Sequence, residues 1–425
     1  MVTIALLGTH DTKGLELQFV REKLIQSGAK VRMVDLATLR EEKAYSPDHS
    51  PSQLAGLAGR SFEELAALPK AEAAEIIVEG ALKLLRYWLD DGELNGAIAL
   101  GGGSGAAMAC AIFRGLPLGF PKVMVSTIAS GDVSFYVGTR DVTMVHSVVD
   151  ITLNRITRLI FAAAAGAVCG MAKSLPVERD TAKPLVAASM YGITQPCVFR
   201  MKEILETEGY EIVVFSAGGN GAKVLEELTA EEHFDGVLDI TTTTMIDEIV
   251  GGIRGAGPGR LEAACSRGIP LLVVPGACEC VNFGPPETIP EKFQERIFIR
   301  HTATTTLMRA AAGEMRELGM KMSEKLNRAK GPAALLVPLR GFSRYDEAGG
   351  PQAMDYAGNP AGTFHDPEAD MAFLEGVQST LDREKVRLME LDLHINDEEF
   401  SKTVAEVFLS LINSTGDRNL CIANY

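Results

Sequence analysis

The chain has 425 residues, of which 46% are hydrophobic, and this is enough apolar material for two or three domains with well-formed cores. A formal net charge of -15 argues against a general nucleic-acid surface, which needs a basic face. No apolar run approaches the length of a membrane span, no secretory signal opens the sequence, and the seven cysteines follow no metal-ligand spacing. We therefore expect a cytoplasmic protein that binds small molecules or proteins, with neither a membrane nor a nucleic-acid partner.

Apolar strands and amphipathic helices alternate along the first half of the chain. The predicted strands are residues 2–7, 30–36, 96–100 and 122–126, and the predicted helices are residues 15–27, 61–90, 104–114 and 154–172. Residues 46–52, rich in proline and serine, interrupt this pattern and are predicted to form an exposed loop over the ligand edge of the sheet.

The opening strand is followed by a loop that offers hydroxyl groups and a positive charge. This loop contains Thr9, Asp11, Thr12 and Lys13. The first strand-to-helix loop of a parallel α/β sheet lies at the carboxyl edge, where ligands bind. Asp11 either caps the following helix or, like Asp35 near the end of the second predicted strand, holds a metal ion.

A glycine-rich loop joins the third predicted strand to the next helix. It reads Gly101-Gly102-Gly103-Ser104-Gly105. Glycine lets backbone N–H groups approach a phosphate, and the start of a helix carries partial positive charge. The spacing matches neither a P-loop nor the dinucleotide fingerprint, and a tight turn also needs glycine for packing. The loop therefore predicts either an anion site or close packing of strand against helix.

The fourth predicted strand ends in another polar loop, which contains Ser126, Thr127, Ser130 and Gly131. Three such loops, each after a strand of the same half, would converge on one edge of one sheet. This convergence favours a ligand site more strongly than any single loop does.

The second half repeats the alternation. Its predicted strands are residues 185–189, 211–215, 236–240, 270–274, 333–337 and 386–390, and its predicted helices include residues 304–328 and 397–412. The polar residues 173–184 form the natural linker. We predict an α/β protein of two doubly wound, Rossmann-like domains with mainly parallel sheets facing a cleft. Residues 1–180 are the predicted nucleotide-binding domain, and residues 181–425 are the predicted second domain with a substrate or partner site.

The second half also carries the polar residues that chemistry would need. Candidate catalytic groups are Asp239 at a strand end, His301 before a predicted helix and His394 in a late loop, and candidate substrate ligands are Thr242, Thr243, Asn282 and Arg296. Each has a structural alternative: threonines favour strands, loop histidines often serve as plain donors, and His301 could cap the helix.

Two further segments are noted in this half. Residues 218–221, Gly-Gly-Asn-Gly, form a fourth strand-to-helix glycine loop and a second candidate anion site. Cys278 and Cys280, on either side of Glu279, are interpreted as ordinary thiols.

These residues together amount to a family resemblance. The segments that carry it are Gly8-Thr-His-Asp-Thr-Lys13, Leu100-Gly-Gly-Gly-Ser-Gly105, residues 117–131, Asp239-Ile-Thr-Thr-Thr243, Val281-Asn-Phe-Gly-Pro285 and His394-Ile-Asn-Asp397. In order and spacing, the chain from residue 3 to about residue 411 resembles the family of the ATP-binding inhibitory domain found in the tomato mosaic virus resistance protein of tomato. The tail, residues 416–425, has no counterpart in that resemblance.

The resemblance implies ATP binding and a homodimer more than it implies a reaction. It places the phosphates against the backbone of residues 102–105, with the loops after the first and fourth strands around them, and Mg²⁺ is a further candidate ligand. Some relatives carry an additional barrel domain, which implies a separate barrel-domain chain as a partner. Two functional classes follow: an enzyme of small-molecule metabolism that uses ATP, or an ATP-dependent protein-binding module without catalysis.

Overall fold

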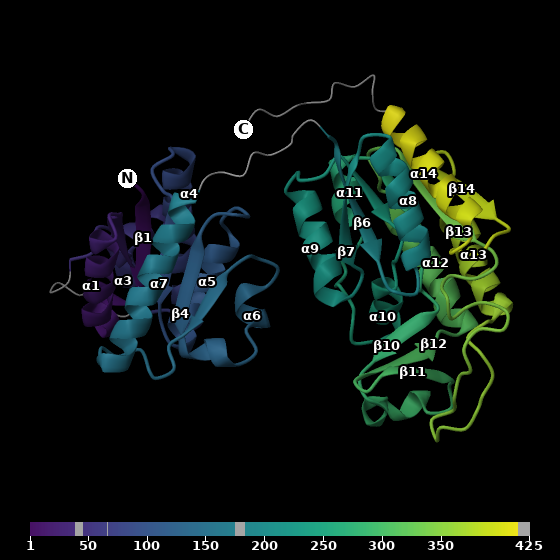
Figure 1. The fold of residues 1–425 in the computed structure, drawn as a ribbon, viewed down its shortest axis with the longest axis horizontal. Coiled ribbons are helices and arrows are strands. Elements are labelled where there is room, and N and C mark those ends of the chain that lie inside the picture. The colour runs from purple at the N-terminus through teal and green to yellow at the C-terminus, as the bar shows by residue number, and fades with distance from the viewer. Residues whose placement is uncertain (39–45, 66, 175–182, 415–425) are drawn as a thin grey trace. The chain divides into compact units, whose positions relative to one another are not determined.

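The computed structural model describes residues 1–38, 46–65, 67–174 and 183–414. The chain divides into two compact units, Met1–Glu178 (unit 1) and Arg179–Tyr425 (unit 2). Each unit has its own parallel sheet with helices on both faces (Figure 1), so the predicted α/β class with two doubly wound domains is confirmed. Most of the predicted linker and the whole tail 416–425 lie outside the described residues.

Unit 1 contains a five-stranded sheet in the order β2-β1-β3-β4-β5, and all of its pairs are parallel. The strands are β1 (Thr3–Gly8), β2 (Lys30–Asp35), β3 (Gly96–Leu100), β4 (Lys122–Ser126) and β5 (Thr143–His146). The edge strand β5 was not predicted. It has only four residues, and they are partly or fully exposed, so they form no continuous apolar run.

Helices cover both faces of this sheet. They are α1 (His10–Gln26), α2 (Pro51–Leu57), α3 (Phe62–Leu65), α4 (Lys70–Asp90), α5 (Gly103–Arg114), α6 (Ser134–Val137) and α7 (Arg155–Lys173). Side chains alternate along β1, so Ile4 and Leu6 pack with α1 and α7 while Ala5 and Leu7 pack with α4 and α5. This alternation fixes which helix lies on which face.

Three boundaries in unit 1 differ from the sequence prediction. Helix α1 begins at His10 but is interrupted by a non-helical residue, Lys13, shortly before the predicted start at residue 15; the predicted helix 61–90 is divided into α3 and α4. The predicted exposed loop 46–52 instead contacts the sheet edge, where His49 forms a β-bridge with Val34. Ser50 then caps α2 through a reciprocal pair of hydrogen bonds with Gln53.

Helix α7 is the one helix of the described residues that is long and apolar enough to cross a membrane by length and composition alone. Its buried residues, which include Phe161, Ala165 and Val168, pack with α1 and the strands of unit 1. This packing is typical of a core helix in an α/β domain.

Unit 2 contains a six-stranded sheet in the order β14-β13-β9-β8-β6-β7, again with parallel pairs throughout. The strands are β6 (Leu185–Met190), β7 (Glu211–Ser216), β8 (Gly236–Asp239), β9 (Leu271–Val273), β13 (Ala333–Pro338) and β14 (Val386–Leu391). One face packs with α8 (Gln195–Thr207) and α14 (Glu398–Asn413). The other packs with α9 (Gly219–Ala230), α10 (Thr244–Val250), α11 (Glu262–Arg267), α12 (Ala312–Leu326) and α13 (Pro367–Thr380).

A small antiparallel sheet at one end of unit 2 was missed by the sequence analysis (Figure 1). Its strands are β10 (Cys280–Phe283), β12 (Thr305–Arg309) and β11 (Phe298–Thr302), in that order. The predicted helix 304–328 is therefore wrong in its first part, and α12 begins only at Ala312. The β-branched Thr305 and Thr306 favour a strand, which pairs with β10 and β11 on its two sides.

Candidate functional site

The strand order of unit 1 marks one position at the carboxyl edge of its sheet. From the neighbouring strands β1 and β3 the chain proceeds outward in opposite directions, and the helices that follow them, α1 and α5, pack on opposite faces. Ligands of doubly wound proteins bind in the crevice at such a reversal. The loops after β1 and β3 flank this position, and the loop after β4 is next to them.

The glycine loop after β3 is tightly packed at one end and open in the middle. A Cβ atom at Gly101 would lie 2.8 Å from the Cα of Gly105, whereas one at Gly102 or Gly103 would meet nothing within 4 Å. Gly102 is the N-cap of α5, whose first amides have no acceptor inside the helix. Packing therefore explains Gly101, and Gly102 and Gly103 leave the backbone accessible to a ligand.

A lysine that the sequence analysis missed lies beside this loop. Lys70, the first residue of α4, places its Nζ 3.5 Å from the Oγ of Ser104, and both side chains are exposed. The sequence analysis placed Lys70 in the middle of one long helix over residues 61–90 and therefore did not consider it as a ligand. In the structure it is a cation at the edge of the glycine loop.

The loop after β1 forms the start of α1. Thr9 is the N-cap residue, and its Oγ1 lies 2.7 Å from the Oγ1 of Thr12. Asp11 lies in the first turn and is partly exposed, so it is not the cap. Lys13 donates from Nζ to the carbonyl oxygen of Ile151 at 2.7 Å. Because an ammonium group has three donors, Lys13 keeps two for another acceptor.

Asp35, at the end of β2, is fully buried. Its Oδ1 accepts the backbone N–H groups of His10 and Ala37, each at 2.9 Å. Burial raises the pKa of this carboxyl, and the two N–H groups oppose the shift. Asp35 thus fixes the start of α1, and its burial favours this structural role over metal binding.

In the loop after β4, one predicted residue faces inward and three reach the surface. Ser126 is buried, and its Oγ accepts the N–H of Ile128 at 3.3 Å. Thr127 is partly exposed, and Ser130 and Gly131 are exposed. The accessible hydroxyls of this loop are therefore those of Thr127 and Ser130.

The candidate catalytic Asp239 in unit 2 forms a buried ion pair. Arg260 donates from Nη2 to its Oδ1 at 2.5 Å, and the same guanidinium bonds to Glu226 at 2.8 Å. Ser189 adds a hydrogen bond of 2.6 Å from its Oγ. Asp239 and Arg260 are 0% and 2% exposed. These contacts favour a structural role for Asp239, and the sequence analysis did not identify Arg260 as its partner.

The threonines after β8 are buried and hold neighbouring segments together. Thr242 donates to the carbonyl of Val274 at 3.0 Å, and its Oγ1 lies 3.2 Å from the Sγ of Cys278. Thr243 donates to the carbonyl of Cys280 at 3.0 Å. Both threonines are fully buried. The structural alternative therefore accounts for them better than substrate binding does.

Asn282 holds a buried carboxylate. Its backbone N–H donates to Oδ1 of Asp247 at 2.7 Å, and its Nδ2 donates to Oδ2 at 3.1 Å. The N–H of Arg254 also donates to Oδ2, at 3.2 Å. Burial raises the pKa of Asp247 to about 7, while these donors oppose the shift. The side chain of Asn282 is thus engaged by Asp247, which favours a structural role over substrate binding.

His301 and His394 both contact the loop after β13, which the sequence analysis did not single out. The Nδ1 of His301 lies 2.8 Å from the hydroxyl of Tyr345, and the Nε2 of His394 lies 2.9 Å from the carbonyl oxygen of Ser343. His301 is exposed on β11, so the suggestion that it caps a helix is wrong. Arg296 bonds to Glu314 and to a backbone carbonyl, which ties it to α12.

Beside this loop, three buried carboxyl groups surround one arginine. Arg309 donates to Asp370 at 2.7 Å, and Ser343 donates to Glu279, which lies near Asp346. Burial and the charge of Asp346 raise the pKa of Glu279 to about 7, and burial also raises that of Asp370 well above its ordinary value. For Glu279 and Asp370, burial thus favours the protonated carboxyl. Its members are far apart in sequence, so no motif indicated it.

Family comparison matches both halves of the chain. The N-terminal domain of the Uncharacterised protein family (UPF0261) matches residues 2–176, and the C-terminal domain of the same family matches residues 183–412. The chain belongs to the UPF0261 family.

Individual relatives agree with this assignment. A UPF0261 protein of Clostridium tetani is 40% identical over 411 residues, which cover 96% of this chain and 98% of that protein. The ToMV resistance protein Tm-1(GCR237) of Solanum lycopersicum is 35% identical over 428 residues, which cover 95% of this chain and 55% of the tomato protein. The family resemblance seen in the motifs is thereby confirmed. A UDP-N-acetylglucosamine 2-epimerase from Rickettsia bellii covers 98% of this chain and 99% of its own at 12% identity, but its TM-score of 0.23 carries no argument.

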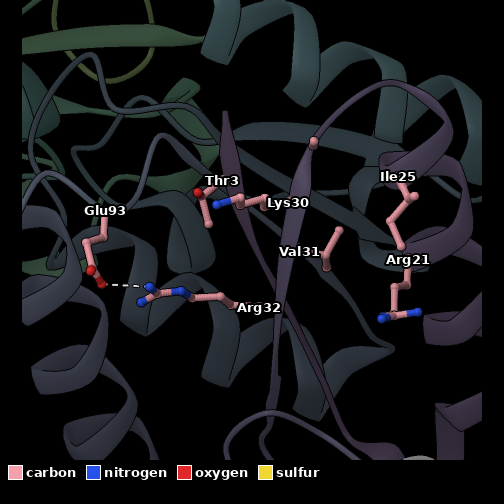
Figure 2. Close-up of a pocket in the computed structure, with 8 residues that line it drawn as sticks. Thr3, Arg21, Ile25, Lys30, Val31, Arg32 and Glu93 are labelled. Carbon is pink, nitrogen blue, oxygen red and sulfur yellow. Dashed lines mark hydrogen bonds and ion pairs between the residues drawn. The ribbon is translucent and has the colours of Figure 1, made fainter. Parts of the chain in front are cut away.

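One cavity of this UPF0261 protein lies beside β1 and β2 of unit 1 (Figure 2). It has a volume of about 500 Å³ and is bordered by Thr3 and Lys30, the first residues of β1 and β2. Figure 2 shows Arg32 turned toward Glu93, with which it forms an ion pair of 2.6 Å. The cavity is thus at the amino edge of the sheet, whereas ligands of this architecture bind at the carboxyl edge. We therefore take the three loops as the candidate site.

Proposed function

We propose that unit 1 binds ATP at the carboxyl edge of its sheet, between the loops after β1 and β3. The observation that carries the proposal is the open backbone at Gly102 and Gly103, where α5 begins beside the reversal of strand order. A phosphate there would accept hydrogen bonds from the first amides of α5, and the helix dipole favours its charge.

The neighbouring side chains supply further donors for a triphosphate. Lys70 is next to Ser104, and Thr9 and Thr12 lie at the start of α1. Lys13 retains donors beyond its bond to Ile151. Charge-assisted bonds of this kind hold phosphates without a P-loop lysine.

Mg²⁺ would reach this site mainly through the nucleotide. Among the described residues, no group of three or more His, Cys, Asp or Glu side chains has the arrangement to hold a metal ion. Asp11 is the partly exposed carboxylate of the loop after β1, so it is the protein group that we assign to such an ion. The phosphates and water would supply the remaining oxygen ligands.

We further propose that the protein is a cytoplasmic homodimeric enzyme of small-molecule metabolism. The buried carboxyl groups around Arg309, where burial raises the pKa of Glu279 to about 7, support proton-transfer chemistry in unit 2. The alternative is an ATP-dependent protein-binding module, which the structural contacts of Asp239, Thr242 and Thr243 favour. A separate barrel-domain chain remains a proposed partner on the family resemblance alone.

Calorimetry on a matched pair of glycine variants tests the nucleotide site. Gly103→Val places a side chain where a phosphate would lie, whereas Gly166→Val fills an equally open position on α7. We expect Gly103→Val to abolish ATP binding with its melting temperature retained, and Gly166→Val to bind ATP as the wild type does. Unchanged ATP affinity in a folded Gly103→Val protein would remove the loop from the site.

A product screen separates the two functional classes. The wild type is incubated with ATP and sets of phosphorylated or carboxylated metabolites, and ADP, AMP, phosphate and pyrophosphate are measured. Release that depends on one metabolite class supports the enzyme. ATP binding without any release across the screen supports the binding module.

A further inference from the structure

The sheet of unit 2 has its own reversal of strand order, between β6 and β8. Helix α8 follows β6 on one face, and α10 follows β8 on the other. The carboxyl ends of these strands are therefore the expected place for a ligand of unit 2. Tyr191 is the first residue after β6, and the glycine loop 218–221 follows the adjacent strand β7.

Arg254 brings a fixed positive charge to this place. Its carbonyl oxygen accepts the N–H of Gly219 at 3.1 Å, and its own N–H donates to Asp247 at 3.2 Å. Its guanidinium is partly exposed and donates to the Oγ1 of Thr305 at 3.3 Å. Within the described residues no carboxylate forms an ion pair with this guanidinium, so its charge is available to a ligand.

Tyr191 lies directly beside this cation. The Arg254 guanidinium is 5.9 Å from the centroid of the Tyr191 ring, a cation–π distance. The hydroxyl oxygen is buried and interacts with this guanidinium, while its own proton has no acceptor among the described residues. A Cβ atom at Gly218 would lie 2.5 Å from that oxygen, so glycine is required where the hydroxyl approaches the start of α9.

The start of α9 supplies donors at the same point. Gly218 is its N-cap and forms no side-chain cap, and a Cβ atom at Gly219 would meet nothing within 4 Å. The N–H groups of Gly219 and Gly221 already donate to the carbonyls of Arg254 and Gly218, at 3.1 and 2.8 Å. Among the first three amides of this 12-residue helix, that of Asn220 is left for an external acceptor within the described residues. A cation, a buried hydroxyl and a helix start thus converge from three separate segments.

The nearby carboxylates form no ion pair with Arg254 in the described part of the chain, although the charge of Asp247 acts on it. Asp247 accepts three N–H donors from Asn282 and Arg254, and Glu248 accepts the N–H of Gly257 at 2.7 Å. Asp239 is paired with Arg260. Each of these carboxylates is engaged by other donors.

We propose that Arg254, Tyr191 and the backbone amide of Asn220 at the start of α9 bind the anionic group, a phosphate or a carboxylate, of a small-molecule ligand of unit 2. Arg254 supplies the charge, the Tyr191 hydroxyl donates one hydrogen bond, and Asp247 positions the Arg254 backbone without touching the ligand. This site consists of residues of unit 2 only. The proposal is therefore independent of the nucleotide site proposed for unit 1.

Hydrogen-exchange mass spectrometry on the full chain tests the proposal, because it reports on residues 217–224 apart from unit 1. The probes are inorganic phosphate and succinate, each titrated at constant ionic strength. We expect one of them to slow amide exchange at the start of α9, which also decides between phosphate and carboxylate. Arg254→Gln should weaken this protection about tenfold or more, the effect of losing a charge-assisted hydrogen bond.

A charge-matched control variant and a second test variant accompany Arg254→Gln. Arg328→Gln removes an equal charge from a side chain that is 71% exposed, and it should bind the probe as the wild type does. Tyr191→Phe keeps the ring under the guanidinium and removes only the hydroxyl, so it provides a second test if Arg254→Gln fails to fold. Wild-type protein without protection by either probe, or equal protection in the wild type, Arg254→Gln and Tyr191→Phe, would overturn the proposal.

Discussion

Arg260 and Asp239, the last residue of β8, form a buried ion pair that includes a hydrogen bond of 2.5 Å from Nη2 to Oδ1. Glu226 from α9 bonds to the same guanidinium at 2.8 Å. The pair therefore joins β8, α9 and the segment before α11. Because both charges of this buried pair are engaged by protein groups, we expect Asp239 to stabilise the fold and not to act in catalysis.

Asp239→Asn should therefore destabilise unit 2 strongly. The asparagine keeps the shape but leaves the buried Arg260 with only Glu226 as a charged partner, which should cost about 3 kcal/mol of the free energy of unfolding. Urea unfolding measures this loss. Asp392→Asn, which breaks an exposed pair with Arg340, is the control and should change little. A fully stable Asp239→Asn protein would restore the catalytic interpretation of this residue.

The sequence predicted the strands of both parallel sheets well, apart from the short edge strand β5. Continuous apolar runs such as those of β1 and β13 are buried on both faces, and glycine or polar loops follow them. The antiparallel sheet of unit 2 was missed because β11 and β12 carry charged or polar residues within five-residue strands. Their pairing depends on contacts between strands and not on a local pattern.

The candidate site was predictable to different degrees in the two units. In unit 1 the glycine loop was recognised from the sequence as a candidate anion site. Lys70, which lies beside this loop, was not recognised. In unit 2 the polar residues at strand ends were recognised, but their partners were not. The segment between Asp239 and Arg260 contains α10, and the segment between Arg309 and Asp370 contains α12 and β13, so only the fold brings these charges together.

Lys13→Met should affect both ATP binding and stability. Loss of the hydrogen bond to the Ile151 carbonyl should cost about 1 kcal/mol of the free energy of unfolding. If the remaining donors meet a phosphate, ATP binding should weaken by roughly 1.5 to 3 kcal/mol while adenosine binding stays the same. Calorimetry with both ligands and a urea titration separate the two effects. Equal losses for ATP and adenosine would place Lys13 outside the phosphate site.

Gly319→Ala should weaken the packing of α12 against α13. A Cβ atom at Gly319 would lie 2.2 Å from the carbonyl oxygen of Phe373, and one at Gly376 would lie 2.2 Å from that of Arg316. The backbone of α13 has to move to admit the methyl group, at a cost of about 2 kcal/mol. Gly313→Ala on the same helix meets nothing within 4 Å and should be neutral or slightly stabilising. Equal unfolding midpoints for the two variants would contradict this account.

The buried carboxyl of Glu279 should make the protein less stable as the pH rises. Burial, with a contribution from Asp346, raises its pKa from the ordinary 4.5 to about 7. Between these two values the native protein holds a proton that the unfolded chain has lost. The free energy of unfolding therefore falls as the pH rises through this window, and the loss is complete above the folded pKa. Burial shifts the pKa of Asp247 in the same direction, also to about 7.

Glu279→Gln should remove its share of this pH dependence. Glutamine imitates the protonated carboxyl and still accepts the hydrogen bond from Ser343, so the variant should match the wild type near pH 5. Above neutral pH it should be more stable, on the order of 2 kcal/mol, because no buried charge forms. Urea unfolding between pH 5 and 8 measures the difference, with the exposed Glu347→Gln as control. Parallel curves for wild type and Glu279→Gln would show that Glu279 is already ionised in the native protein, and the proton-transfer role proposed for this group would lose its support.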